Sequence, residues 1–164
     1  CRVPDENVIG EIGSGFAVAM KTLDDGRLTL SAAAIGMAQR VLDLCVDYSK
    51  QRVQFGKPIA KQQAVQFMLS DMAMEIYAAR SMLYDAAERS DRKEKITMEA
   101  SMVKLFCTEM VGRVADRGVQ IFGGMGWMRE SAVERIYRDV RIMRIVEGTS
   151  EIQRIIISRE LLRD

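Results

Sequence analysis

One glutamate, Glu147, combines a residue type and a position that could do acid-base chemistry. It lies in the stretch Ile145-Val146-Glu147-Gly148-Thr149-Ser150-Glu151-Ile152-Gln153, between an apolar run and the predicted start of a helix. Ser150 followed three residues later by Gln153 has capping-box spacing, so we expect the helix to begin there and Glu147 to lie in the preceding loop. A carboxylate at such a place more often complements the helix macrodipole than it catalyses a reaction. On this stretch alone both interpretations stay open.

The composition restricts which other groups could act. The chain has 164 residues, no histidine and three scattered cysteines, Cys1, Cys45 and Cys107. A Cys/His metal cluster and histidine-based activation of a nucleophile are therefore excluded, and acid-base work falls to carboxylates, lysine or tyrosine. Cys45 and Cys107 lie in apolar helical runs, which is typical of small core residues in a protein from a reducing compartment.

The bulk properties predict one globular domain. Apolar residues make up 48% of the chain and charged residues 29%, and the 24 Lys and Arg nearly balance the 23 Asp and Glu. This balance argues against nucleic acid as a partner. We expect a soluble, non-secreted protein, because no run approaches the roughly 18 apolar residues of a membrane span and no signal peptide opens the chain. Because the chain begins at Cys1 rather than at methionine, we also expect a fragment of a longer polypeptide.

The elements that must position Glu147 are predicted to be helices. Only two prolines occur, and long runs of helix formers carry apolar residues at steps of three and four. The pattern predicts long helices beginning near residues 16, 65 and 98, a short one after Ser131, and a last one from Ser150. The helix near residue 98 is apolar on more than one side, so we expect it to be central. The buried stripe of the first helix is predicted to comprise Phe16, Met20, Leu23, Arg27, Leu30, Ala34, Met37, Val41, Leu44 and Tyr48.

Arg27 stands in that stripe where the pattern asks for an apolar side chain. A buried guanidinium needs a partner, which could be Asp24 or an anionic ligand. An arginine that snorkels from the edge of the stripe explains the position equally well.

Two loops follow predicted helix ends. The segment Gln51-Arg52-Val53-Gln54-Phe55-Gly56-Lys57-Pro58 is basic, and Gly56 is expected to cap the first helix. The segment Gly123-Gly124-Met125-Gly126 has three glycines in four residues, which suits an anion nest as well as an ordinary helix end and turn. It lacks the strand and the lysine of a P-loop.

Several of these motifs together resemble the acyl-CoA dehydrogenase family in order and spacing. They are Asp24-Asp25-Gly26-Arg27, Arg52-Val53-Gln54-Phe55-Gly56-Lys57-Pro58, Gln120-Ile121-Phe122-Gly123-Gly124 and Glu147-Gly148-Thr149-Ser150. The resemblance is to the C-terminal helical domain of that family. It implies an all-α, up-and-down four-helix bundle with an additional short helix, formed by residues 16–164 after a linker of residues 1–15 from a missing β-domain. It also implies assembly into a homodimer or homotetramer.

The resemblance also assigns roles to residues of this chain. It implies that Glu147 is the α-proton base and that Asp24, Arg27 and Gly148 contact the substrate. Some relatives place the base immediately before the residue matching Arg27, but that position is Gly26 here, which cannot act. The positions expected to contact FAD are Arg52, Gln54, Phe55, Gln63, Gln120, Gly123 and Gly124, on the flavin of a neighbouring subunit, and Thr149 and Glu151, on the flavin of their own subunit.

The activity so implied is the α,β-dehydrogenation of an acyl-CoA thioester to a trans-2-enoyl-CoA, a reaction of fatty acid β-oxidation. The implied electron acceptor is an electron-transferring flavoprotein, and the compartment is the cytoplasm of a bacterium or the mitochondrial matrix of a eukaryote. Without a β-domain we expect the isolated chain to be inactive. An oligomerisation module with a decayed site and an acyl-CoA oxidase of the same superfamily remain as alternatives, and the acyl chain length stays unassigned.

Overall fold

Long runs of helix-forming residues, interrupted by few glycines and prolines, produce the helices of the computed structural model, which describes residues 1–163. The last residue of the predicted bundle domain, at position 164, lies outside the described residues. The α-helices are α1 (Gly15–Gln51), α2 (Gln63–Asp91), α3 (Thr97–Phe122), α4 (Ala132–Asp139) and α5 (Ser150–Leu161). Four short 3₁₀ segments connect them: η1 (Asp5–Asn7), η2 (Ile59–Lys61), η3 (Gly123–Trp127) and η4 (Val140–Arg144).

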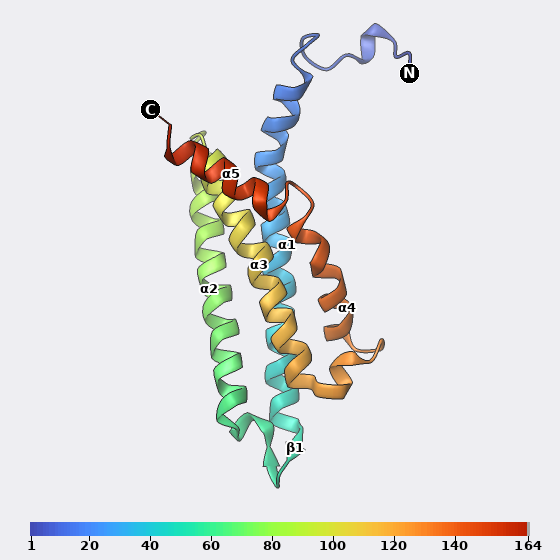
Figure 1. The fold of residues 1–164 in the computed structure, drawn as a ribbon, viewed down its shortest axis with the longest axis vertical. Helices are drawn as coiled ribbons and strands as arrows, with labels where there is room; N and C mark the ends of the chain where they lie inside the picture. Colours follow the sequence, from blue (N-terminus) through green and yellow to red (C-terminus); the bar gives the residue numbers. More distant parts are fainter. Residues whose placement is uncertain (164) are drawn as a thin grey trace.

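The helices form the predicted four-membered bundle. α1, α2 and α3 run side by side in alternating directions, and α4 continued by η4 runs along α3 as the fourth member (Figure 1). α5 is the additional helix, and it crosses α3 near the upper end of the bundle. The short loop from η4 to α5 therefore lies beside both α1 and α3.

α3 is the centre of the bundle, as its apolar pattern predicted. It contacts all four other α-helices, and buried side chains line several of its sides. Gly118 permits close packing of these helices, because a Cβ atom at this position would lie 2.5 Å from Val41 on α1 and 3.2 Å from Val133 on α4. A residue on a buried face of α3 is therefore enclosed by the neighbouring helices.

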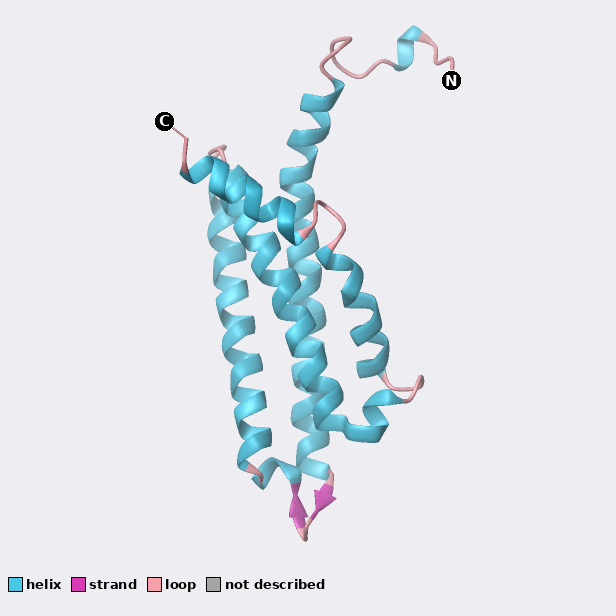
Figure 2. Ribbon diagram, viewed as in Figure 1, coloured by secondary structure: helices cyan, strands magenta, loops and turns pink. Residues whose placement is uncertain are grey.

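The first part of α1 differs from the prediction. Phe16 is 77% exposed and Met20 is 39% exposed, although both belong to the predicted buried stripe. The physical reason is length, since α1 extends beyond the ends of its neighbours (Figures 1 and 2). Within the described chain, α1 is also the one helix long and apolar enough to cross a membrane by length and composition. Its buried face packs against α2 and α3, as that of a core helix does.

A small hairpin follows α1. Strands β1 (Val53–Gln54) and β2 (Lys57–Pro58) pair antiparallel, as Figure 2 shows in magenta. Phe55 and Gly56 form the turn between them with φ values of 53° and 77°, which is the left-handed conformation of a two-residue hairpin turn. Gly56 is therefore left-handed as expected, but the expectation that it caps α1 is wrong, because α1 ends at Gln51.

Candidate active site

The loop that carries Glu147, residues 145–149, has an unusual backbone. Glu147 has a φ of 58° and Gly148 a φ of 91°. The second value suits glycine, but a non-glycine residue in the left-handed region costs about 1–3 kcal/mol and persists only where its surroundings hold it. The contacts around Glu147 must therefore supply that restraint.

Side chains from three helices hold the two carbonyl groups of this turn. Gln153 on α5 donates from Nε2 to the carbonyl oxygens of Glu147 at 2.9 Å and Gly148 at 3.0 Å. Lys104 on α3 donates from Nζ to the oxygen of Gly148 at 2.8 Å. Arg27 on α1 points its Nε at the oxygen of Glu147 at the longer distance of 3.5 Å. The backbone of the turn is thus fixed from several directions.

Glu109 on α3 fixes both ends of the loop. Its carboxylate accepts a hydrogen bond from the hydroxyl of Ser150 at 2.6 Å and lies 3.3 Å from Nε of Arg144. Arg144 directly precedes the loop, and Ser150 directly follows it. The predicted cap at Ser150 is consequently wrong by one residue: Thr149 is the N-cap of α5, and its hydroxyl accepts from the amide of Ile152 at 3.4 Å.

The carboxylate of Glu147 lies directly over Gly26 on α1. A Cβ atom at Gly26 would stand 2.6 Å from Oε2 of Glu147, closer than real Cβ contacts allow. Gly26 carries no side chain that could act as a base. Because it has no side chain, it also leaves the space that the Glu147 carboxylate occupies.

Arg27 and Asp24 form the polar floor beside this carboxylate. Arg27 is buried, and its Nη1 pairs with Asp24 at 2.7 Å, so the expected partner is present. Asp24 also accepts a hydrogen bond from Thr97 at 3.0 Å. A cleft of about 450 Å³ opens beside Asp24 between the exposed part of α1 and the end of α5.

Lys104 is the site residue that the sequence analysis missed. It is fully buried, and burial is the main cause that lowers its pKa, with the nearby Arg27 acting in the same direction. Three carboxylates, Glu109, Glu147 and Glu151, raise the pKa and oppose these effects. The sequence does contain a sign of this residue, because Lys104 interrupts the apolar face of α3 as Arg27 interrupts that of α1.

The residues expected to contact a neighbour's flavin gather at the other end of the bundle. Arg52, Gln54 and Phe55 belong to the hairpin end of α1, and Gln63 begins α2. Tyr48 stacks on Phe122 with ring centroids 4.2 Å apart, which joins this end of α1 to the end of α3. The remaining members, Gln120, Gly123 and Gly124, lie at that end of α3.

The surface at the hairpin end of the bundle is exposed to solvent. Gly123 and Gly124 are exposed, with nothing within 4 Å of an added Cβ atom, and Arg52 is exposed without an ion pair to another described residue. An exposed guanidinium and an uncovered glycine turn are both groups that can bind an anion such as a pyrophosphate.

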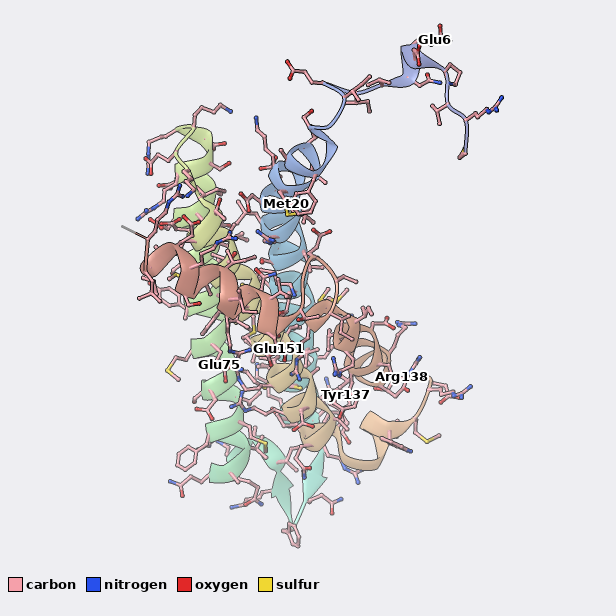
Figure 3. The ribbon with its side chains drawn as sticks, turned by 45° about the horizontal axis from the view of Figure 1, so that its top comes forward. Glu6, Met20, Glu75, Tyr137, Arg138 and Glu151 are labelled. Carbon is pink, nitrogen blue, oxygen red and sulfur yellow. The ribbon has the colours of Figure 1, made fainter. Side chains whose placement is uncertain are left out.

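Thr149 and Glu151 lie at the start of α5, next to Glu147 and far from this surface. Along α1, the 26 residues from Gly26 to Arg52 span about 39 Å at the α-helical rise. Glu151 is exposed, and its carboxylate accepts from its own amide and from the hydroxyl of Thr149, which keeps its pKa below the ordinary value (Figure 3). The structure therefore brings the predicted site residues together in two groups rather than in one.

A larger cleft, of about 680 Å³, lies between α3, α4 and η4, near the labelled Tyr137 and Arg138 in Figure 3. Five arginines line it, but no predicted site residue does. The chemistry favours the Glu147 region instead, because its carboxylate stands in a restrained loop over a helix glycine.

Comparisons with known proteins identify relatives along nearly the whole chain. A family model described as the C-terminal domain of acyl-CoA dehydrogenase matches residues 13–162. The CarC subunit of the caffeyl-CoA reductase-Etf complex of Acetobacterium woodii is 48% identical over 99% of this chain and 43% of its own length. The short-chain specific acyl-CoA dehydrogenase of Homo sapiens is 45% identical over 99% of this chain and 40% of its own length.

Among solved structures, the butyryl-CoA dehydrogenase of Megasphaera elsdenii is 46% identical and superposes with a TM-score of 0.96, over 98% of this chain and 42% of that one. The chain thus spans about two fifths of the length of the relatives it matches. On this evidence the chain belongs to the acyl-CoA dehydrogenase family and corresponds to its C-terminal helical domain.

Proposed function

We propose that this chain is the C-terminal domain of a FAD-dependent acyl-CoA dehydrogenase in which Glu147 removes the α-proton of an acyl-CoA thioester. One observation carries the proposal. The Glu147 carboxylate rests in the space left by Gly26, on a loop whose strained backbone is held by Lys104, Gln153 and Arg27. Strain that is maintained by several contacts marks a functional position more often than an ordinary helix start.

The residues of this chain have distinct tasks in such a reaction. The Glu147 carboxylate takes the α-proton, and its basicity increases when the apolar acyl chain replaces the water around it. The backbone amide of Glu147 helps to hold the thioester oxygen, where negative charge develops, and Gly148 lets the substrate approach the turn closely. The Arg27–Asp24 pair forms the polar floor of the substrate site. A bound FAD would supply the acceptor for the β-hydrogen as hydride.

The two groups of predicted flavin contacts lie far apart, which supports a flavin site shared between two copies of the chain. A single flavin cannot reach from Thr149 to Arg52 along about 39 Å of α1 within one copy, so the groups serve different flavins. In this proposal Arg52, Gln54, Phe55, Gln63, Gln120, Gly123 and Gly124 bind the flavin of a neighbouring copy in a homodimer or homotetramer. Thr149 and Glu151 approach the flavin of their own copy.

The remainder of the site would come from other domains. Residues 16–164 form the bundle domain in this proposal, and residues 1–15 lead to it from a β-domain. The isolated chain is then expected to bind flavin weakly and to show no turnover. The Acetobacterium relative is a subunit of a caffeyl-CoA reductase-Etf complex, which supports an electron-transferring flavoprotein as the electron acceptor. Several relatives are named for short-chain or butyryl substrates, which favours a short acyl chain.

The test replaces Glu147 with Gln in the complete protein and follows bleaching of the bound flavin by a short-chain acyl-CoA in a single turnover. A lost general base costs about 10²- to 10⁴-fold in rate, so we expect flavin reduction to fall by at least 100-fold. Glu88→Gln, an exposed carboxylate on α2, is the matched control and should reduce flavin at the normal rate. Undiminished reduction in Glu147→Gln would refute the base assignment. No reduction in the unmodified protein would instead favour an oligomerisation module.

A further inference from the structure

Lys104 is a buried basic side chain for which packing alone gives no reason. Its exposed fraction is 0%, and it lies on the apolar face of α3 between Ala100, Val103 and Cys107. Burying an ammonium group costs several kcal/mol unless partners compensate it, and a methionine or leucine would fill the same volume without that cost. The side chain must therefore provide something that an apolar one cannot.

The contacts of Lys104 point to the Glu147 turn. Its Nζ donates to the oxygen of Gly148 at 2.8 Å, one residue beyond Glu147. The charged groups that face it come from every neighbouring element: Arg27 from α1, Glu109 from α3, Glu147 from the loop and Glu151 from α5. Burial and Arg27 lower the pKa of Lys104, and the three carboxylates oppose this lowering.

The hydrogen bond and the charge of Lys104 have separable consequences. Gln153 also donates to the oxygen of Gly148, at 3.0 Å, so this carbonyl keeps one donor if Lys104 is lost. The positive charge of Lys104 can be replaced only weakly by that of Arg27, because Arg27 is already paired with Asp24 at 2.7 Å. Lys104 is thus a cation near Glu147 that forms no ion pair with a carboxylate among the described residues.

We infer that Lys104 is a positioning residue for the base: it holds the Gly148 carbonyl so that the turn stays left-handed, and its charge interacts favourably with the Glu147 carboxylate when substrate excludes water. This inference rests on the proposed function. A positive charge beside a carboxylate favours its ionised form, and the effect grows as the local dielectric constant falls. Without Lys104, the turn loses one hydrogen-bond donor and the Glu147 carboxylate loses a nearby positive charge.

The experiment measures single-turnover flavin reduction against pH in the complete holoenzyme, with Lys104→Met and Lys104→Gln. Methionine keeps the volume and removes both the hydrogen bond and the charge, whereas glutamine keeps a donor and removes only the charge. For both variants we expect the acidic limb of the rate profile to move to higher pH by about 1 unit, the low end of the effect of losing one nearby opposite charge. The acyl-CoA concentration for half-maximal reduction should stay within about two-fold, because Lys104 contacts the loop and not the substrate floor. Lys95→Met removes an exposed lysine at the same end of the bundle and serves as the charge control.

A second measurement does not depend on turnover. Amide hydrogen exchange over residues 146–149 of the substrate-free holoenzyme should be faster in Lys104→Met than in Lys104→Gln or in the unmodified protein. If both variants keep the original pH profile and exchange rates while Glu147→Gln abolishes reduction, the Lys104 inference is overturned and the proposed function stands. If Glu147→Gln reduces flavin normally, the proposed function fails and the positioning role falls with it.

Discussion

Gly26 offers the sharpest perturbation of the site, because adding one methyl group there acts on Glu147 and on little else. A Cβ atom at Gly26 would stand 2.6 Å from Oε2 of Glu147, whereas ordinary contacts begin at 3.4 Å. In Gly26→Ala the carboxylate must therefore move by about 0.8 Å. Misplacing a catalytic group by about 1 Å costs up to 10²-fold, so we expect single-turnover flavin reduction to slow by about 30- to 100-fold.

The same substitution should leave folding intact, which separates the effect from a general loss of structure. Alanine is favoured over glycine inside a helix by about 1 kcal/mol, and the displaced atoms are the far end of a flexible side chain. The midpoint of thermal unfolding should thus stay constant or rise. Gly36→Ala is a matched control on the same helix, because nothing lies within 4 Å of an added Cβ atom there. It should gain the same helix stability and keep the full rate.

A reduction rate in Gly26→Ala within about two-fold of normal would refute the reasoning. That result would mean that the carboxylate does not act from the position over α1. A slow rate accompanied by a lower unfolding midpoint would likewise contradict it, because the defect would then be one of packing.

Three further predictions concern the core. Burial raises the pKa of Cys45 and of Cys107 to about 12, so in the folded chain a thiol reagent at pH 8 should modify the exposed Cys1 alone, as mass spectrometry can count. Since unfolded thiols ionise near pH 9, the unfolded state binds fewer protons above that pH, and the free energy of unfolding should fall between about pH 9 and pH 12. A Cys45→Ala, Cys107→Ala double variant should lose this slope, and an unchanged slope would contradict the assignment. Gly118→Ala places a Cβ atom 2.5 Å from Val41, so overpacking should outweigh the gain in helix propensity and lower stability by about 1 kcal/mol in urea unfolding; increased stability would show that α1 and α3 can separate without cost.

The helices of this fold could be read from the sequence because each long helix keeps one apolar face over many turns. The prediction was wrong where burial depends on which neighbour is present. Phe16 and Met20 continue the apolar stripe of α1 beyond the ends of α2 and α3, so periodicity could not show that this part is uncovered. The cap of α5 was wrong for a related reason: Ser150 has capping-box spacing, but its hydroxyl serves Glu109 on α3, a partner distant in sequence.

The candidate site was predictable only in part. Arg27 attracted attention because it interrupts an apolar stripe, and its predicted partner Asp24 lies one turn away on the same helix. Lys104 interrupts an equally apolar face, but its acceptor is 44 residues away and on a loop. The contact between Gly26 and Glu147 joins segments 121 residues apart, and neither residue carries a local sign of the other. Such tertiary contacts follow from the docking of α1, α3 and the loop, which no local pattern specifies.

Removal of the α-proton by Glu147, which is the central claim, can be measured without hydride transfer. In the complete protein, incubation in D₂O with an acyl-CoA analogue whose β-position cannot be oxidised should replace the α-hydrogen with deuterium, as NMR detects. The account predicts exchange in the unmodified protein and a loss of at least 100-fold in Glu147→Gln. Exchange at the normal rate in Glu147→Gln would show that another group removes the proton, and it would contradict the account.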